Sequence, residues 1–257
     1  MSVEPKIAFR DVHLAFGPKQ VLKGVDLEVA KGESLVVIGG SGSGKSVLIK
    51  TVLGITTPDQ GEVCLDGENV VGAGGRRRAE LNKRIGMLFQ GGALFDSLTV
   101  LDNVAFGLVQ SGIARGKEAH DRALETLSRV GLDENVAALL PVELSGGMQK
   151  RVALARAIAD QPEIIFFDEP TTGLDPIMSD VINHLIIECV RDLGATAVTI
   201  THDMRSARTI ADNVAMIYDG RIIWHGPVEN IDTDANPYLD QFVHGRAEGP
   251  IKMTVRR

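Results

Sequence analysis

One eight-residue segment constrains this chain more than any other. The segment Gly39–Ser46 has the sequence GGSGSGKS and directly follows the apolar run Leu35–Ile38. Such a run is typical of a strand buried on both faces of a parallel sheet. The residues Ser46–Leu53 then have a helical pattern that Gly54 ends. A glycine-rich turn between strand and helix lets backbone N–H groups approach phosphate oxygens, so the segment predicts an α/β fold built around a phosphate-binding loop.

The residues of this loop have separable roles in holding a nucleoside triphosphate. Lys45 would reach the β- and γ-phosphates, and Ser46 would be a ligand of Mg²⁺. The other phosphate-binding candidates of the loop are Gly39, Ser41, Gly42, Ser43 and Gly44. The alternative, a glycine-rich turn without a ligand, is disfavoured because the whole motif matches in the expected strand–helix context.

Further apolar runs predict a mostly parallel central sheet. They are Ile85–Phe89, Ile164–Phe167, Ala197–Ile200 and Val214–Tyr218. Helical patterns lie between several of them, and strands that alternate with helices indicate α/β architecture. The N-terminal residues are expected to form short strands broken by turns, at Ile7–Phe9, Val12–Phe16 and Val25–Val29.

One stretch interrupts the alternation of strands and helices. From about Asp102 to Leu140 the pattern is nearly all helical. We therefore expect a main domain over residues 5–235, with a helical subdomain inserted at about 100–160. Residues 236–257 are expected to form a C-terminal extension that begins with a short amphipathic helix and continues as an extended tail.

Two carboxylates end one of the buried runs. Asp168 and Glu169 follow four apolar residues, as expected at the carboxyl end of a central strand. Asp168 can hold a metal ion through water, and Glu169 is placed to polarise a water in line with the γ-phosphate. Together with the loop at Gly39–Ser46, this pair indicates a nucleoside triphosphatase.

A second helix start offers another site for an anion. Ser145, within the segment Leu144–Gln149 (LSGGMQ), can cap a helix over Met148–Ala159. One nucleotide within one chain hardly needs two such sites. A head-to-tail pair of chains would place this helix start against the γ-phosphate bound by the other copy. Taken alone, the segment would be better explained as an ordinary serine-capped helix after a glycine turn.

Composition excludes several classes of protein. Lys and Arg number 27 against 34 Asp and Glu, and aromatic residues make up 4%, which disfavours nucleic acid as a partner. Cys64 and Cys189 provide neither a disulfide framework nor a metal pair. No apolar run approaches the ~20 residues that span a bilayer, and the first ten residues lack a signal-peptide core, so a cytoplasmic location is expected.

The ordered motifs resemble the nucleotide-binding domain of ATP-binding-cassette (ABC) proteins. In chain order they are Gly39–Ser46, Gln90, Leu144–Gln149, Ile164–Glu169, Leu174-Asp175 and His202. The resemblance implies a P-loop NTPase fold with an N-terminal antiparallel β subdomain, a mostly parallel central sheet and an inserted helical subdomain. It also implies ATP and Mg²⁺ as ligands and a second copy of the chain as a partner.

The resemblance assigns further roles residue by residue. Gln90 would sense Mg²⁺ and couple to a membrane partner, and His202 would contact the γ-phosphate. Asp175 would bridge the dimer interface, and Phe16 matches the place of the aromatic residue that stacks on adenine. Ser145 and Gly147 would contact phosphate. The resulting catalytic candidates are Lys45, Gln90, Glu169 and His202, and the metal-binding candidates are Ser46, Gln90 and Asp168.

Within the ABC family, the segment Gly86–Val100 is similar to the ATPase subunits of Mla (maintenance of lipid asymmetry) phospholipid transporters. This similarity implies two copies beneath an integral membrane permease, at the cytoplasmic face of the inner membrane. It further implies a STAS-domain regulator, a periplasmic MCE-domain lipid-binding protein, and a C-terminal extension that reaches the neighbouring subunit and contacts the regulator. The apolar cluster Ala93–Phe95 with Leu98 is either a groove for the permease or buried within the domain.

Three alternatives remain open at the level of sequence. The transporter could carry another hydrophobic solute. A soluble ABC ATPase of DNA repair or translation would need a long insertion, a second cassette or a basic surface, none of which the sequence contains. A non-enzymatic sensor subunit is disfavoured by the intact Lys45, Asp168, Glu169 and His202.

Overall fold

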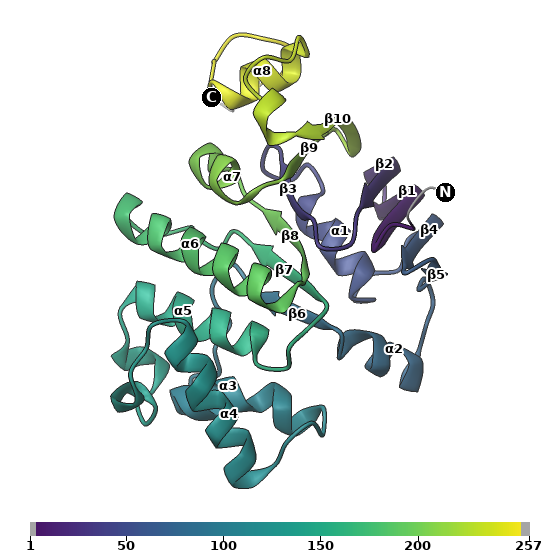
Figure 1. Cartoon of the computed structure of the whole chain (residues 1–257). Helices are drawn as coiled ribbons and strands as arrows, with labels where there is room; N and C mark the ends of the chain where they lie inside the picture. The colour runs from purple at the N-terminus through teal and green to yellow at the C-terminus, as the bar shows by residue number, and fades with distance from the viewer. Residues whose placement is uncertain (1–3, 253–257) are drawn as a thin grey trace.

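The computed structural model describes residues 4–252. It contains two sheets and the helices that pack on them (Figure 1). The smaller sheet has four strands in the order β2-β1-β4-β5, paired antiparallel. Its strands are β1 (Ile7–Phe16), β2 (Lys19–Val29), β4 (Gln60–Leu65) and β5 (Glu68–Asn69). The last five residues of the predicted extension, 253–257, lie outside the described range.

The larger sheet has six strands in the order β10-β9-β3-β8-β7-β6. Those from β9 to β6 are parallel, and β10 is paired antiparallel at the edge. Their bounds are β3 Ser34–Ile38, β6 Ile85–Leu88, β7 Ile164–Asp168, β8 Thr196–Ile200, β9 Asn213–Tyr218 and β10 Arg221–Pro227. The antiparallel first sheet and mostly parallel second sheet confirm the predicted fold class.

Helices cover both faces of the larger sheet. They are α1 Lys45–Val52, α2 Gly75–Asn82, α3 Val100–Gln110, α4 Gly116–Arg129, α5 Gly146–Ile158, α6 Pro176–Leu193, α7 Met204–Ile210 and α8 Pro237–Val243. Short 3-10 turns occur at Glu134–Val136, Pro141–Glu143 and Val228–Asn230. In Figure 1, α3 and α4 lie beyond α5 at one end of the molecule, and α8 lies at the other. No helix within residues 4–252 is long and apolar enough to cross a bilayer.

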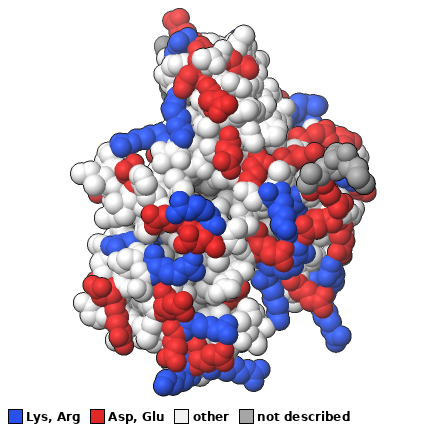
Figure 2. Space-filling model, in the orientation of Figure 1, with Lys and Arg blue, Asp and Glu red and all other residues white. Residues whose placement is uncertain are grey.

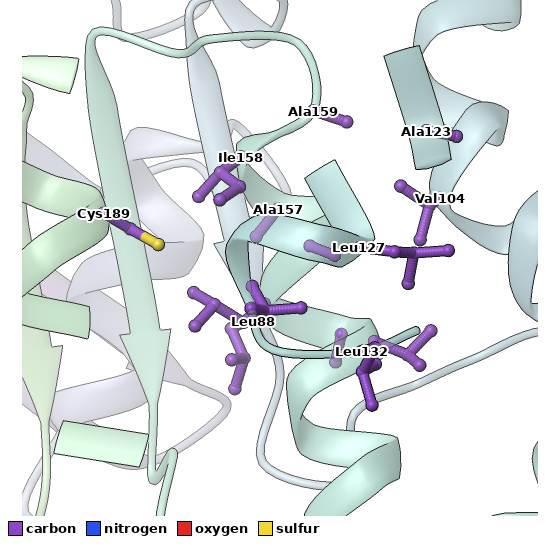
Figure 3. Packing of buried hydrophobic residues seen from close by; sticks show 14 of the residues in the cluster. Leu88, Val104, Ala123, Leu127, Leu132, Ala157, Ile158, Ala159 and Cys189 are labelled. Carbon is purple, nitrogen blue, oxygen red and sulfur yellow. The ribbon is translucent and has the colours of Figure 1, made fainter. Parts of the chain in front are cut away.

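The alternation of side chains along β7 divides the hydrophobic core. Ile164 and Phe166 belong to the cluster between the two sheets and α1. Ile165 and Phe167 face the other way, into the cluster formed with α3, α4, α5 and α6. This period of two explains why the run is apolar at every position, because both faces of the strand are covered. Figure 3 shows part of the second cluster, to which Leu88, Leu127 and Ala157 belong.

The expected short N-terminal strands are wrong in one respect. Ile7–Phe9 and Val12–Phe16 belong to one continuous strand, β1. The pairing register shifts between Phe9 and Val12, where Asp11 has a left-handed φ of 47°. A bulge of this kind lets a strand continue past an irregular residue, so the alternation in the sequence is interrupted without a turn. The edge strand β10, which the sequence patterns did not indicate, is a second difference.

The start of the C-terminal extension packs on the rest of the chain. Leu239 and Val243 of α8 are buried in a cluster with α7 and β9, and Tyr238 and Phe242 are partly buried against it. The tail after α8 is also fixed rather than simply extended, because Ile251 exchanges two hydrogen bonds with the buried side chain of Gln241.

Candidate nucleotide-binding site

The loop Gly39–Gly44 connects β3 to α1 and needs glycine at defined positions. Gly39 and Gly44 have φ values of +151° and +112°. A Cβ at Gly44 would lie 2.9 Å from Leu22, and one at Gly39 would overlap the carbonyl oxygen of Ile217. The backbone therefore passes too close to its neighbours for any side chain at Gly39 or Gly44, and the left-handed φ at both positions also favours glycine.

Two polar side chains in the loop have the surroundings expected of phosphate ligands. The Ser43 hydroxyl is buried and has no hydrogen-bond partner within residues 4–252. The Lys45 ammonium donates to the carbonyl oxygens of Gly39 (2.8 Å) and Gly40 (3.0 Å). Burial lowers the pKa of Lys45, and the carboxylates of Glu169 and Asp168 act in the opposite direction. A phosphate group would give both side chains a charged partner.

Phe16 stands at the mouth of this loop. It lines a cavity of about 250 Å³ together with Lys19, Val21, Gly42, Gly44, Lys45, Ser46 and Val47. Its side chain is 51% exposed, so Phe16 is not a core residue of β1. An exposed ring beside a phosphate-binding loop is suited to stacking on a nucleobase.

Ser46 and Asp168 meet where a metal ion is predicted. The Ser46 hydroxyl donates to Asp168 Oδ1 across 3.3 Å, and this hydrogen bond joins the start of α1 to the end of β7. Burial raises the pKa of Asp168 and outweighs the hydrogen bond from Ser46. A partly buried carboxylate beside a hydroxyl is a donor set that fits Mg²⁺. Gln90, two residues after β6, is exposed, and no hydrogen bond fixes its side chain within the described range.

Glu169 is held by two partners. Its Oε1 lies 2.8 Å from His202 Nδ1, and its Oε2 accepts a hydrogen bond of 3.0 Å from the Thr172 hydroxyl. The Glu169 backbone has a φ of 50°, and its N–H donates to the carbonyl of Ile200 at the end of β8. The structure thus brings together Glu169 and His202, which the sequence analysis singled out separately. The sequence analysis missed Thr172, because nothing in a run of two threonines marks one of them as a partner.

Ser145, Gly147 and Asp175 lie at the starts of two helices. The Ser145 hydroxyl caps α5 by accepting from the N–H of Met148 at 3.3 Å, as predicted. A Cβ at Gly147 would lie 2.8 Å from the Met178 sulfur, so α5 starts against the start of α6. Asp175 caps α6. None of the three lines the cavity beside Lys45.

The model of the ABC transporter family matches residues 22–172. This chain belongs to the ABC transporter family. The match contains the loop, Ser145, Gly147 and the Asp168–Glu169 pair, and it confirms the resemblance drawn from the motifs. The chain is an ABC-type ATPase.

Relatives of this ABC ATPase extend over nearly its whole length. It is 39% identical over 250 residues to the intermembrane phospholipid transport system ATP-binding protein MlaF of Escherichia coli K12, covering 97% of this chain and 93% of MlaF. The chloroplastic protein TRIGALACTOSYLDIACYLGLYCEROL 3 of Arabidopsis thaliana is 39% identical over 262 residues, with 96% of this chain and 75% of the relative covered. The resemblance to Mla-type ATPases is therefore confirmed.

Solved structures agree with this family and fold. The dimeric, post-hydrolysis ATP-binding cassette MJ0796 bound to ADP and Pi has a TM-score of 0.79 and 33% identity, covering 86% of this chain and 98% of that one. Structure cbiO1 of Clostridium perfringens has a TM-score of 0.81 and 28% identity, covering 95% of this chain and 94% of the other.

Proposed function

We propose that this chain is the ATPase subunit of a phospholipid transporter, and that two copies drive a separate membrane permease. The observation that carries the proposal is the identity of 39% to MlaF over 97% of the chain, together with the loop, Phe16 and Glu169 in the arrangement described above. Its place is the cytoplasmic face of the inner membrane, where the permease holds it. ATP is its substrate, and nucleic acid is not a partner.

ATP would lie with its base on Phe16 and its phosphates on Gly39, Ser41, Gly42, Ser43 and Gly44. Lys45 would then exchange the carbonyls of Gly39 and Gly40 for the β- and γ-phosphates. Ser46, Asp168 and Gln90 would hold Mg²⁺, which neutralises phosphate charge when bound.

Glu169 is the general base in this proposal. Its carboxylate would accept a proton from the attacking water, and His202 and Thr172 would keep it oriented toward that water. The exposed His202 can also contact the γ-phosphate. Lys45 and Gln90 complete the set of catalytic candidates.

The second half of each site comes from a second copy. Ser145, Gly147 and Asp175 do not line the cavity at Lys45. A head-to-tail dimer would bring the helix start of one copy to the phosphates bound by the other. The dimeric MJ0796 cassette, at a TM-score of 0.79, supports this arrangement. Each ATP would then be enclosed by two chains.

An exposed aromatic pair is the proposed permease contact. The predicted apolar cluster is divided, because Leu94 packs against the core while Phe95 is 41% exposed. The centroids of the Phe95 and Phe106 rings are 4.5 Å apart, and the Phe106 side chain is 37% exposed. Exposed apolar side chains that lie together are candidate contacts for a partner. They follow Gln90 closely enough to link the permease to the nucleotide site.

The domain limits and remaining partners belong to the same proposal. Residues 5–235 would form the nucleotide-binding domain, with the helical subdomain at about 100–160. The extension 236–257 would contact the neighbouring subunit and a STAS-domain regulator, and an MCE-domain protein would receive lipid in the periplasm. Tyr238 and Phe242 pack partly on their own chain, so other residues of the extension would supply most of that surface.

Purification from membranes tests this function. The chain, carrying an affinity tag, should retain a permease and bound phospholipid, identified by mass spectrometry of proteins and extracted lipids. The complex in vesicles should hydrolyse ATP faster when phospholipid is present. Retention of a different hydrophobic solute would show that this solute, and not phospholipid, is the transported substance. Recovery without any membrane protein would contradict the transporter role.

The face in Figure 2, where acidic and basic side chains are interspersed, offers no broad basic region for nucleic acid.

A further inference from the structure

Lys150, in the second turn of α5, is a buried cation whose role no motif explains. Its side chain is only 7% exposed. Within residues 4–252 its hydrogen-bond acceptors are two backbone carbonyls and no carboxylate. Burying an ammonium group costs folding free energy unless hydrogen bonds compensate for the lost water. Burial also lowers the pKa of Lys150.

The two acceptors are the carbonyl oxygens of Gln90 and Glu169. Lys150 Nζ donates to Gln90 and lies 3.4 Å from the Glu169 oxygen. These residues follow β6 and β7, which are neighbours in the parallel sheet. One side chain of α5 therefore joins the backbone of the proposed Mg²⁺ sensor to that of the proposed general base.

A second cation of α5 fixes the loop that continues from Gln90. The Arg156 guanidinium donates to the carbonyl oxygens of Gly92 and Ala93, each at 2.7 Å. Loop 90–93 is thereby attached to α5 at both ends. A displacement of α5 is therefore expected to move this loop. Among the hydrogen bonds of residues 4–252, Lys150 alone extends the connection from α5 to Glu169.

We propose that Lys150 is a positioning residue that sets the Glu169 backbone relative to α5. Because Ser145 caps α5, engagement of that helix start by the ATP of a second copy would be transmitted to the chain's own general base. This inference rests on the proposed dimer. The effect should appear in the rate of hydrolysis at an occupied site, because Lys150 donates to the backbone carbonyls of Gln90 and Glu169.

The test compares Lys150→Met, which keeps the length of the side chain and removes its charge, with Lys150→Arg. Both variants of the full chain are assayed in the complex with its permease, and turnover is expressed per ATP-binding site. Lys150→Met should lower kcat by at least about tenfold, as expected when a reacting group is displaced, and leave the Kd for ATP within about twofold. Lys150→Arg should retain most of the activity, because the cation is kept.

Lys83→Met is the matched control. Lys83 also donates to a backbone carbonyl, that of Ser111, but lies outside the site, so its variant should keep the wild-type kcat. If Lys150→Met fails to fold, Lys150→Gln replaces it with the same expected result. Turnover per site within about twofold of wild type would overturn the role of Lys150. The dimer itself is tested separately by ATP-dependent dimerisation of Glu169→Gln, so the two failures are distinguishable.

Discussion

The Glu169 carboxylate and the His202 imidazole are 2.8 Å apart although 33 positions separate them in the chain. Glu169 follows β7 and His202 follows β8, which are adjacent strands of the parallel sheet. The pair is therefore created by strand order. Thr172 donates to Glu169 Oε2, so two side chains together orient this carboxylate.

Replacement of Glu169 by Gln should separate ATP binding from hydrolysis. The amide keeps the shape of the side chain but cannot accept the proton of the attacking water, so turnover should fall by at least about 100-fold. ATP binding should persist, and the closed dimer should accumulate on size-exclusion chromatography with ATP. Glu118→Gln, an exposed change in α4, is the control and should hydrolyse ATP normally. Undiminished hydrolysis in Glu169→Gln would contradict the assignment.

Removal of the Phe16 ring should weaken nucleotide binding. Base–aromatic stacking contributes about 1–3 kcal/mol, so Phe16→Ala should raise the Kd for ATP by roughly 5- to 150-fold. The rate at saturating ATP should change little, because the ring does not touch the phosphates. Calorimetric titration with ATP measures the effect, and Phe16→Tyr should restore affinity. An unchanged Kd in Phe16→Ala would remove the ring from the site.

A bulky charge at the start of α5 should prevent the second copy from completing the site. Ser145→Arg should lower turnover by about 100-fold, as expected for loss of donors that stabilise the transferred phosphoryl group. The Kd of the isolated monomer for ATP should be unaffected, because Ser145 does not line the cavity at Lys45. Sedimentation of the Ser145→Arg/Glu169→Gln double variant with ATP should give monomer. A stable dimer with normal hydrolysis in Ser145→Arg would contradict the head-to-tail arrangement.

Acid should destabilise the junction of the two sheets. Hydrogen bonds from Arg84 and then Lys6 lower the pKa of Glu163 from 4.5 to about 2. A lowered pKa in the folded state contributes stability above pH 4.5 that is lost as the pH falls toward 2. Because Glu163 is half exposed, we expect about 1 kcal/mol from this group.

Urea denaturation of Glu163→Gln at several pH values measures this contribution. The variant should be less stable than wild type at pH 7, and the difference should shrink as the pH falls below 4.5. Glu118→Gln removes an exposed helical ion pair with Arg122 and should change stability by less than about 0.5 kcal/mol. An equal loss for Glu163→Gln at every pH would contradict the linkage.

Truncation can test the C-terminal extension without removing its helix. Deletion of residues 236–257 would remove Leu239 and Val243 from the core, so deletion of residues 246–257 is the sharper variant. We expect this shorter deletion to fold and to lose assembly with the regulator, measured by co-purification. Complete assembly and transport after the deletion would contradict a contact role for these residues.

The local elements of the site could be predicted from the sequence because they depend on neighbouring residues. The glycines of the loop, the apolar run of β3 and the helix cap at Ser145 are each short segments. The conformation of each follows from the residues within it. The bulge at Asp11 and the edge strand β10 were missed because they depend on pairing with other strands. Local pattern does not contain that information.

The sequence by itself determined which residues are available for nucleotide chemistry and which strand and helix ends carry them. The tertiary structure alone decided which of them meet. Ser46 reaches Asp168 across 122 positions, and Lys150 reaches Gln90 across 60. Thr172 and Lys150 became visible only there, since a hydroxyl or an ammonium acquires its role from the carboxylate or carbonyl that folding places beside it. The packing of parallel strands creates those contacts, because it brings the ends of distant segments to one edge of the sheet.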